Sequence, residues 1–473
     1  MKYSAINIGP IVDTLSLARK PRELWSASYL FSFLMKCIYE EVENDLGPDA
    51  IISPAKVVFN QGSVSARAVG LYPDRIYFRG EVDPLALRRA VRSKMEYEHV
   101  AIPFDYFNVM YVSCEAAGDA EAICALNRQM DSLELFNVAP VKSAEKDVFP
   151  LLKAKTVEDG SRRAESRLFE IATGTPLFEV QSFYDLARAG RTGKECSYDR
   201  YVCIVQADGD NVGKTVSNPA LPDGEVLKIS KELLKFGQEA ARMIDEFGGM
   251  PLYAGGDDLL FIAPVVGKDG RDIFQLVQAL DESAFQGVKD EVRRCGLTVD
   301  GKPVEASLSF GISCSFVKYP LYEALGTARS LLFDMAKREP KNRIAWKLRK
   351  HSGGSFDFSF TLRDAKIRSM FRALVDKAED DEIVSALAHK LRENGSLLAT
   401  ILESGDASNR LDAFFDRTLE FKDNAWFRTV RELIPALYDS IGLDNLPPAL
   451  FGMLRTAKFL HGEPVREDEF VGD

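Results

Sequence analysis

The sequence is poor in histidine and lacks closely spaced cysteines. Four of its 473 residues are histidine; none precedes an aspartate, and none lies three or four positions from another histidine. A hydrolase built on a histidine-bound metal is therefore not expected. The seven cysteines are scattered, and no two of them show the C-x-x-C spacing of a shared metal site. Their odd number and wide separation predict reduced thiols and a cytoplasmic protein.

Long apolar segments and an excess of positive charge are also absent. The N-terminus has no basic stretch followed by an apolar block, and no apolar run approaches the length of a bilayer, so we expect no membrane association. Lys and Arg number 60 against 71 Asp and Glu, a net charge of -11. This balance argues against coating nucleic acid by bulk charge, although it is compatible with a local basic surface.

The length and the order of secondary-structure signals indicate an α+β protein with a duplicated unit. At roughly 150 residues per domain the chain corresponds to about three domains. The order strand, helix, two strands, helix, strand occurs twice, which is the βαββαβ pattern of a ferredoxin-like domain. We expect a first such domain at 1–115, a helical insert or linker at 116–198, a second domain at 199–352 and, after a linker at 352–355, helices only over 356–473.

Three carboxylates stand where the second unit would bring them together. Asp257 and Asp258 follow Gly255 and Gly256 in a turn between two short apolar strands, and glycine lets a ligand such as a triphosphate approach the backbone. Asp208 ends an apolar strand about fifty residues earlier. We expect this strand to lie beside the strand that enters the turn, so that the three side chains meet. Hard oxygen ligands of this kind suit Mg²⁺ or Mn²⁺.

Candidate phosphate-binding residues surround these carboxylates. Asn211, Val212, Gly213 and Lys214 follow the first strand directly, where successive backbone N–H groups can form an anion-binding nest beside a lysine. The segment Lys337–Lys350 contains seven basic residues and one Glu. It can be read as a polyphosphate-binding cluster or as a solvated helix end. The GGDD turn and the DGD turn are each common structural turns when taken alone, but their presence together on matching elements favours a functional site.

Four motifs in order resemble a known family. The segments ADGDNVGK at 207–214, YAGGDD at 253–258 and SLSFGIS at 307–313, with the pairs Ala336-Lys337 and Lys341-Asn342, are similar to the palm polymerase domain of the large subunit of type III CRISPR effector complexes. The N-terminal INIGPIVDTLSLARKPRELWSASYL looks like the first palm domain of that family's RAMP-module (Cmr) branch. The resemblance covers roughly residues 1–110 and 200–352.

The resemblance implies two palm domains, nucleotides bound between them, and a role for each matching residue. Asp208 and Asp257 would be metal ligands, Asp258 would complete the acidic site, and Gly209 could offer its carbonyl. Further residues would bind the nucleotide: the amides of Asn211, Val212 and Gly213, the phosphate-holding Lys337, and also Lys214, Gly255, Gly256, Lys341 and Ser309, the last from a strand that could face the nucleotide.

The implied activity is nucleotide second-messenger synthesis inside an RNA-guided complex. ATP would be converted, with Mg²⁺ or Mn²⁺, into a product that is usually a cyclic oligoadenylate in the family. Pairing of a guide RNA with a target RNA, held mostly by neighbouring subunits, would switch this synthesis on. Two other readings stay open. One is a stand-alone minimal cyclic dinucleotide synthase, and the other is a catalytically silent subunit that anchors guide RNA and partner proteins.

Departures from the family pattern limit what else is expected. The chain begins at the first palm and has no His-Asp pair, so we expect no HD nuclease activity. Cys124 and Cys196 are too far apart to suggest the family's zinc module. In the first palm INIGP stands where ADGD stands later, and no GGDD follows, so we expect that domain to supply no metal ligands. Leu259 and Leu260 after the two aspartates differ from the GG(D/E)EF turn of diguanylate cyclases.

Overall fold

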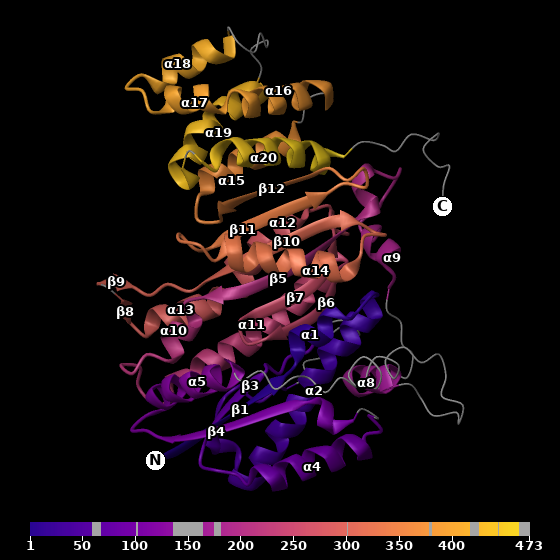
Figure 1. The fold of residues 1–473 in the computed structure, drawn as a ribbon, viewed down its shortest axis with the longest axis vertical. Coiled ribbons are helices and arrows are strands. Elements are labelled where there is room, and N and C mark those ends of the chain that lie inside the picture. The colour runs from indigo at the N-terminus through magenta and orange to yellow at the C-terminus, as the bar shows by residue number, and fades with distance from the viewer. Residues whose placement is uncertain are drawn as a thin grey trace.

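A computed structural model gives the arrangement of the chain as three stacked parts (Figure 1). A small sheet with its helices lies at one end, a larger sheet lies in the middle, and helices alone form the other end. The structure describes residues 1–58, 68–100, 103–135, 164–174, 181–299, 301–377, 381–416, 425–442 and 444–462. Much of the insert expected at 116–198 therefore lies outside the described residues.

The first palm has the expected βαββαβ order. Its four strands pair in the order β2-β3-β1-β4, and β1 runs antiparallel to both neighbours, as in a ferredoxin-like sheet. The long helix begins at Pro21, whose fixed φ and missing N–H suit a first helical position. The elements are β1 (Lys2–Gly9), α1 (Ile11–Ser16), α2 (Pro21–Leu46), η1 (Pro48–Ala50), β2 (Ile51–Ser53), β3 (Arg75–Arg79), α4 (Pro84–Tyr97), η2 (Phe104–Tyr106) and β4 (Asn108–Glu115).

Helix α2 is buried along most of its length because it packs against both palms. It contacts α4 in its own domain and strand β6 (Met250–Gly255) in the second. Trp25 is 1% exposed, and its indole N–H donates to the carbonyl of Ala68 at 2.8 Å. The Ser28 hydroxyl donates to the carbonyl of Leu252 at 3.3 Å. This double contact explains why the helix is apolar on nearly every side.

The first palm also pairs with the second through its backbone. Gly70 forms a parallel bridge with Tyr253 on β6. Its N–H donates to the carbonyl of Leu252 at 3.3 Å, and its carbonyl accepts from the N–H of Ala254 at 2.9 Å. The segment before β3 thus lies along the outer strand of the second sheet. It brings the first palm directly beside the acidic turn.

The described part of the insert is helical, as expected. Its elements are α5 (Asp119–Leu135), α8 (Ala164–Thr173), α9 (Phe183–Ala187) and η3 (Ser197–Arg200). The start of α5 joins the palms through Asp119, whose side chain is 1% exposed. Asp119 accepts from the Arg79 guanidinium at 2.6 Å and from the N–H of Gly224, in front of helix α11 (Glu225–Phe247), at 3.2 Å. A paired buried carboxylate of this kind fixes the two domains together.

The second palm contains a six-stranded sheet in the order β12-β11-β10-β5-β7-β6. One expectation about it is wrong: β5 lies beside β7, the strand that leaves the acidic turn, and not beside the entering strand β6. The elements are β5 (Tyr201–Asp210), α10 (Val212–Val216), α11 (Glu225–Phe247), β6, β7 (Asp258–Pro264), α12 (Ile273–Ala279), the π-helix η4 (Leu280–Ala284), α13 (Gln286–Arg294), β8 (Thr298–Val299), β9 (Lys302–Pro303), β10 (Ser307–Phe316), α14 (Leu321–Ser330), the π-helix η5 (Leu331–Ala336), β11 (Arg343–Arg349) and β12 (Ser355–Thr361).

Strand β12 contradicts the expectation of helices only beyond residue 355. It pairs antiparallel with β11 over the register Arg343–Thr361 to Arg349–Ser355 and forms the edge of the second sheet. Phe356, Phe358 and Phe360 are buried on it, and helix α20 covers it. The rest of the C-terminal part is helical as expected. Its helices are α15 (Ala365–Asp376), α16 (Asp381–Glu393), α17 (Gly395–Leu402), α18 (Ala407–Phe414), α19 (Ala425–Ile441) and α20 (Leu446–His461).

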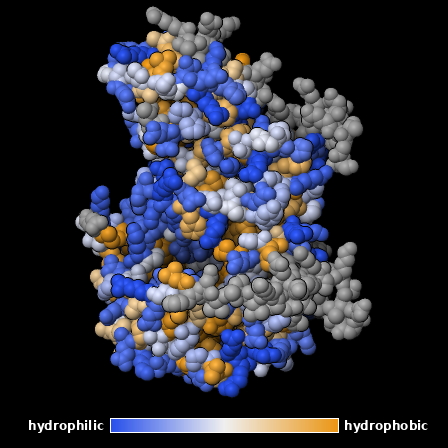
Figure 2. Space-filling model, in the orientation of Figure 1, coloured by the Kyte–Doolittle hydropathy of each residue, from blue (hydrophilic) through white to orange (hydrophobic). Residues whose placement is uncertain are grey.

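The visible surface over the second palm and the C-terminal helices is mostly hydrophilic (Figure 2). Hydrophobic residues appear there singly or in small groups, which is ordinary for a folded protein. Among the helices of the described ranges, none is both long enough and apolar enough to cross a membrane.

Candidate active site

Strand pairing brings the three predicted carboxylates to one corner of the second sheet. Ala207 pairs with Leu259 across β5 and β7, so Asp208 comes next to Asp258 at the same end. The turn between β6 and β7 consists of Gly256 and Asp257, and Gly256 adopts a φ of 67°. This left-handed conformation costs glycine little, which explains the residue type at that position. The local sequence thus holds two aspartates at the tip of a tight hairpin.

Gly209 lets Asp257 lie directly against strand β5. A Cβ atom built on Gly209 would lie 2.4 Å from Asp257 Oδ2 and 2.6 Å from its Cβ, closer than any real contact. Only glycine can therefore stand beside Asp257 in this arrangement. Sequence reasoning assigned Gly209 a carbonyl role, whereas the structure adds a steric one.

Lys337 lies against the carboxylates and not in open solvent. Its ammonium group contacts Asp208 Oδ2 at 2.7 Å and Asp210 Oδ1 at 3.0 Å, and it donates to the backbone carbonyls of Asp208 at 2.9 Å and Gly209 at 2.7 Å. Its side chain is 15% exposed. The lysine expected to hold phosphates thus neutralises the acidic end of β5 in this structure.

Asp210 is a central residue that sequence reasoning did not assign. It is fully buried, and its Oδ2 accepts from the hydroxyls of Ser307 and Ser309, each at 2.8 Å, and from the N–H of Asn342 at 3.1 Å. With Lys337 on Oδ1, four donors surround the carboxylate. It therefore ties β10, the segment before β11 and Lys337 to the end of β5. The sequence contains one signal for this role, the second aspartate of ADGD, because a carboxylate within an apolar strand needs hydrogen-bond partners.

Ser309 does not face open space. Its side chain is 0% exposed, and its hydroxyl donates to Asp210 and accepts from the N–H of Asn342 at 3.2 Å. Contact with a nucleotide would require these bonds to break. Asn342 has a φ of 63°, and its side-chain amide donates to the carbonyl of Leu308 at 3.0 Å. The Ser309 hydroxyl thus stabilises the acidic corner through its bonds to Asp210 and Asn342.

The three clustered carboxyl groups have raised pKa values. Loss of hydration and repulsion by Asp208 raise the pKa of Asp257 to about 7. Desolvation also raises the pKa of Asp208, although Lys337 opposes the shift. The pKa of Asp258 is raised by desolvation and by the charges of Asp208 and Asp257. The cluster is therefore short of positive charge.

The remaining candidates lie around this corner. Asn211 has a φ of 65°, its side-chain amide donates to the carbonyl of Glu305 at 2.9 Å, and its carbonyl accepts from the N–H of Thr215 at 3.0 Å. Val212 is buried, whereas Gly213 and Lys214 are exposed at the first turn of α10. Lys341 is half-buried, and its charge opposes the rise in the pKa of Asp208.

Four of the seven basic residues predicted as a cluster at Lys337–Lys350 are paired with acidic side chains or buried in this structure. Lys347 pairs with Asp357 at 3.3 Å, and the Arg349 guanidinium lies 3.5 Å from Glu323. Arg343 is buried, with an exposed fraction of 7%. The three side chains stand at alternate positions of β11 and therefore share one face, but two of their charges are paired and the third is buried.

The donor chemistry of the corner suits a hard divalent cation. Carboxylate oxygens of Asp208, Asp257 and Asp258 and the carbonyl of Gly209 are the ligands such ions prefer. The raised pKa values show that added positive charge would stabilise the ionised cluster. In the ranges that the structure describes, however, no three His, Cys, Asp or Glu side chains are already placed to hold one ion. Lys337 already contacts two of these oxygen donors, so an ion bound there would compete with it or share them.

Two ferredoxin-like sheets with an acidic hairpin between them define a protein with duplicated palm-like domains. Comparison with family models agrees for both domains. Residues 201–345 match the model of the Cas10/Cmr2 second palm domain, and residues 3–78 match that of the N-terminal part of CRISPR-associated protein Cmr2. Both matched segments thus point to the Cmr branch of the Cas10 family, the large subunits of type III CRISPR complexes, as what this chain is similar to.

Individual relatives agree with this assignment. A CRISPR system Cmr subunit Cmr2 from Pyrococcus furiosus is 29% identical over 184 residues, which cover 33% of this chain and 19% of that protein. The match thus spans about a fifth of the relative's length. A Csm1–Csm4 cassette solved with pppApApA is similar at a TM-score of 0.59, with 14% identity over 97% of this chain and 69% of that one. The apo Type III-B Cmr-β structure gives a TM-score of 0.55, with 11% identity over 97% and 81%. At these identities the two structures show the fold.

Proposed function

We propose that the chain is the nucleotide-polymerising subunit of a type III CRISPR complex and makes a second messenger, in the simplest case a cyclic oligoadenylate, from ATP. The observation that carries this proposal is the packing of Asp257 against Gly209 beside Asp208, with Lys337 behind them. It is supported by the relatives solved as complexes with ATP, pppApApA and cA4.

The proposed reaction is attack of a ribose 3′-hydroxyl on an α-phosphate. The new oxygen–phosphorus bond forms as the bond to the β-phosphate breaks, pyrophosphate leaves, and the hydroxyl proton passes to a base in the site. Asp208, Asp257 and Asp258 would hold Mg²⁺ or Mn²⁺, which would lower the pKa of the hydroxyl and neutralise phosphoryl charge. The chain's own contribution is to hold these oxygens rigidly at a strand end and a hairpin tip, so that positioning supplies much of the rate.

The backbone amides after β5 would receive the triphosphate. Val212 and Gly213 lie at the start of α10, on the same strand end as Asp208, and Gly213 is exposed. Lys214 and Lys341 add nearby positive charge. Guide and target RNA would act through the assembled complex, because this chain's net charge of -11 offers little bulk attraction for them.

The test is product analysis with the assembled complex. Wild-type complex with ATP, Mg²⁺ or Mn²⁺ and target RNA should yield a new nucleotide product in mass spectrometry, and the Asp257→Asn plus Asp258→Asn variant should yield none. A complex that makes no product from ATP, other nucleotides or S-adenosylmethionine would favour the architectural reading. Equal activity of the isolated chain without RNA would favour a stand-alone synthase.

A further inference from the structure

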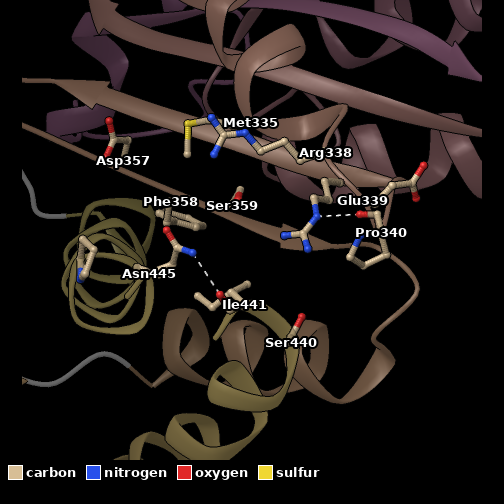
Figure 3. Close-up of a pocket in the computed structure, with 13 residues that line it drawn as sticks. Met335, Arg338, Glu339, Pro340, Asp357, Phe358, Ser359, Ser440, Ile441 and Asn445 are labelled. Atoms are coloured by element: carbon tan, nitrogen blue, oxygen red, sulfur yellow. Dashed lines mark hydrogen bonds between the residues drawn. The ribbon is translucent and has the colours of Figure 1, made fainter. Parts of the chain in front are cut away.

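A separate pocket lies between the edge of the second sheet and the C-terminal helices (Figure 3). Its cavity volume is about 300 Å³, at the lower end of the range for small-molecule sites. One wall is the segment from Met335 to Arg343, another is strand β12, and the third is formed by the end of α19 and the start of α20. None of the three acidic residues described above lines it.

Arg343 lines this pocket as a buried cation without an acidic partner. It is 7% exposed, and its Nε donates to the carbonyl of Pro340 at 2.7 Å. Among the described residues no carboxylate lies within 4 Å of its guanidinium, and desolvation alone lowers its pKa. By contrast, the half-buried Arg372 pairs with the buried Asp272. A guanidinium removed from water without a counter-charge is costly, and an anion in the pocket would relieve that cost.

A second guanidinium reaches the same pocket. The Arg338 side chain extends alongside Met335 in Figure 3, and within the described part of the chain it forms no ion pair. Two acidic side chains also line the pocket, but neither cancels these charges. Asp357 pairs with Lys347 at 3.3 Å, and the Glu339 carboxylate points away from the other labelled side chains. The pocket is therefore positive where the two arginines face it.

The other walls suit an organic group. Phe358, which is 2% exposed, and Met335 line one side, and Ile441, Pro448 and Ala449 line the helical side. The hydroxyls of Ser359 and Ser440 add two further hydrogen-bonding groups. Planar guanidinium groups with five donors match phosphate oxygens in geometry as well as in charge.

We propose that this pocket binds a small phosphorylated organic molecule, with Arg343 and Arg338 on the phosphate and the Phe358 side holding the organic part. The proposal does not depend on catalysis at the acidic site. The two sites nevertheless share a segment, because Lys337 and Asn342, which hold Asp208 and Asp210, lie between Met335 and Arg343. A ligand in the pocket would therefore contact the segment that supports the acidic site.

Thermal unfolding of the full chain tests the proposal. The probes are AMP and inorganic phosphate, added in EDTA so that cation-dependent nucleotide binding at the acidic site does not contribute. With a Kd near 0.5 mM, AMP at 5 mM should raise the Tm of the wild type by roughly 3 °C. Arg343→Met should abolish this shift and leave the unliganded Tm at or above that of the wild type, since it removes an unpaired charge. Arg338→Met, an exposed change that should not impair folding, should at least halve the shift.

The matched control is Arg363→Met, since Arg363 is an exposed arginine that pairs with Glu305 at 3.1 Å outside the pocket. It should keep the full AMP shift. Hydrogen exchange should show AMP-dependent protection at residues 335–343 and 440–449. An equal AMP shift in the Arg343 and Arg338 variants, or protection confined to the acidic hairpin, would overturn the proposal. A shift from inorganic phosphate as large as that from AMP would overturn the assignment of an organic ligand.

Discussion

Substitution of Asp210 by Asn is the sharpest test of how the acidic corner is built. The change keeps the shape of the side chain but removes its charge and turns one acceptor into a donor. If the new NH₂ group takes the place of Oδ2, it faces the donors of Ser307, Ser309 and Asn342. If it takes the place of Oδ1, it faces the ammonium group of Lys337. Neither orientation satisfies all four donors.

The expected cost follows from this geometry. Removing one partner from a buried, hydrogen-bonded charge pair typically costs about 3 to 5 kcal/mol. For a folding unit of 150 to 250 residues this corresponds to a fall in Tm of roughly 6 to 20 °C. The assay is calorimetric or fluorescence-monitored unfolding of the full chain. Asp290→Asn, an exposed carboxylate on α13 paired with Arg293, is the control and should change stability by less than about 0.5 kcal/mol.

A double-mutant cycle with Lys337→Met separates the ion pair from the rest of the network. Because the ammonium lies 3.0 Å from Asp210, the double variant should lose about 1 to 3 kcal/mol less than the sum of the single losses. If Asp210→Asn unfolds within about 1 °C of the wild type, or if the two losses simply add, the network does not hold the corner together as described.

Three further outcomes are expected. Gly209→Ala should displace Asp257 and weaken Mn²⁺ binding at least tenfold in calorimetric titration while the chain stays folded. The control Gly326→Ala, where a Cβ meets no atom within 4 Å, should bind Mn²⁺ normally. Equal Mn²⁺ affinities of the two variants would refute the steric role of Gly209. The pKa of the Asp257 carboxyl is about 3.9 in the unfolded chain and about 7 in the folded protein. Protonation of Asp257 therefore contributes to the free energy of unfolding below about pH 4, and this contribution is lost as the pH rises through 7. Mn²⁺ should accordingly bind more tightly at pH 8 than at pH 6 with release of protons, which titration in two buffers measures, and a pH-independent affinity would contradict the shift. Ser309→Ala should cost about 1 to 3 kcal/mol of stability and leave the KM for ATP unchanged; a raised KM with unchanged stability would restore the nucleotide-facing role.

Local patterns in the sequence predict most of the two palms. Pro21 marks the start of the long helix, and the glycines before Asp257 mark the hairpin, because backbone conformation there depends on a single residue type. Strand β12 is not predicted because the preceding SGGS is typical of a linker, although Phe356, Phe358 and Phe360 alternate with polar residues in the period of a strand.

The burial of an individual side chain is harder to predict from the sequence. ADGD presents Asp208 and Asp210 as equivalent, yet the first is 24% exposed and the second is fully buried. The difference arises because Ser307, Ser309 and Asn342, about a hundred residues or more later, close over Asp210. Lys337 likewise looks free for a phosphate in the sequence, and only the fold places it on β5. Such long-range contacts have no local signal.

The bridge between Gly70 and Tyr253 has a consequence for how a signal could reach the acidic hairpin. Strand β6 would otherwise be an open sheet edge, and the first palm closes it with main-chain hydrogen bonds. The two palms could hinge apart only by breaking those bonds, so the hairpin and the first palm should move as one rigid piece. A conformational change elsewhere in the protein would then reach the site more readily through the segment that carries Lys337, which lies on the other side of β5 from the hairpin.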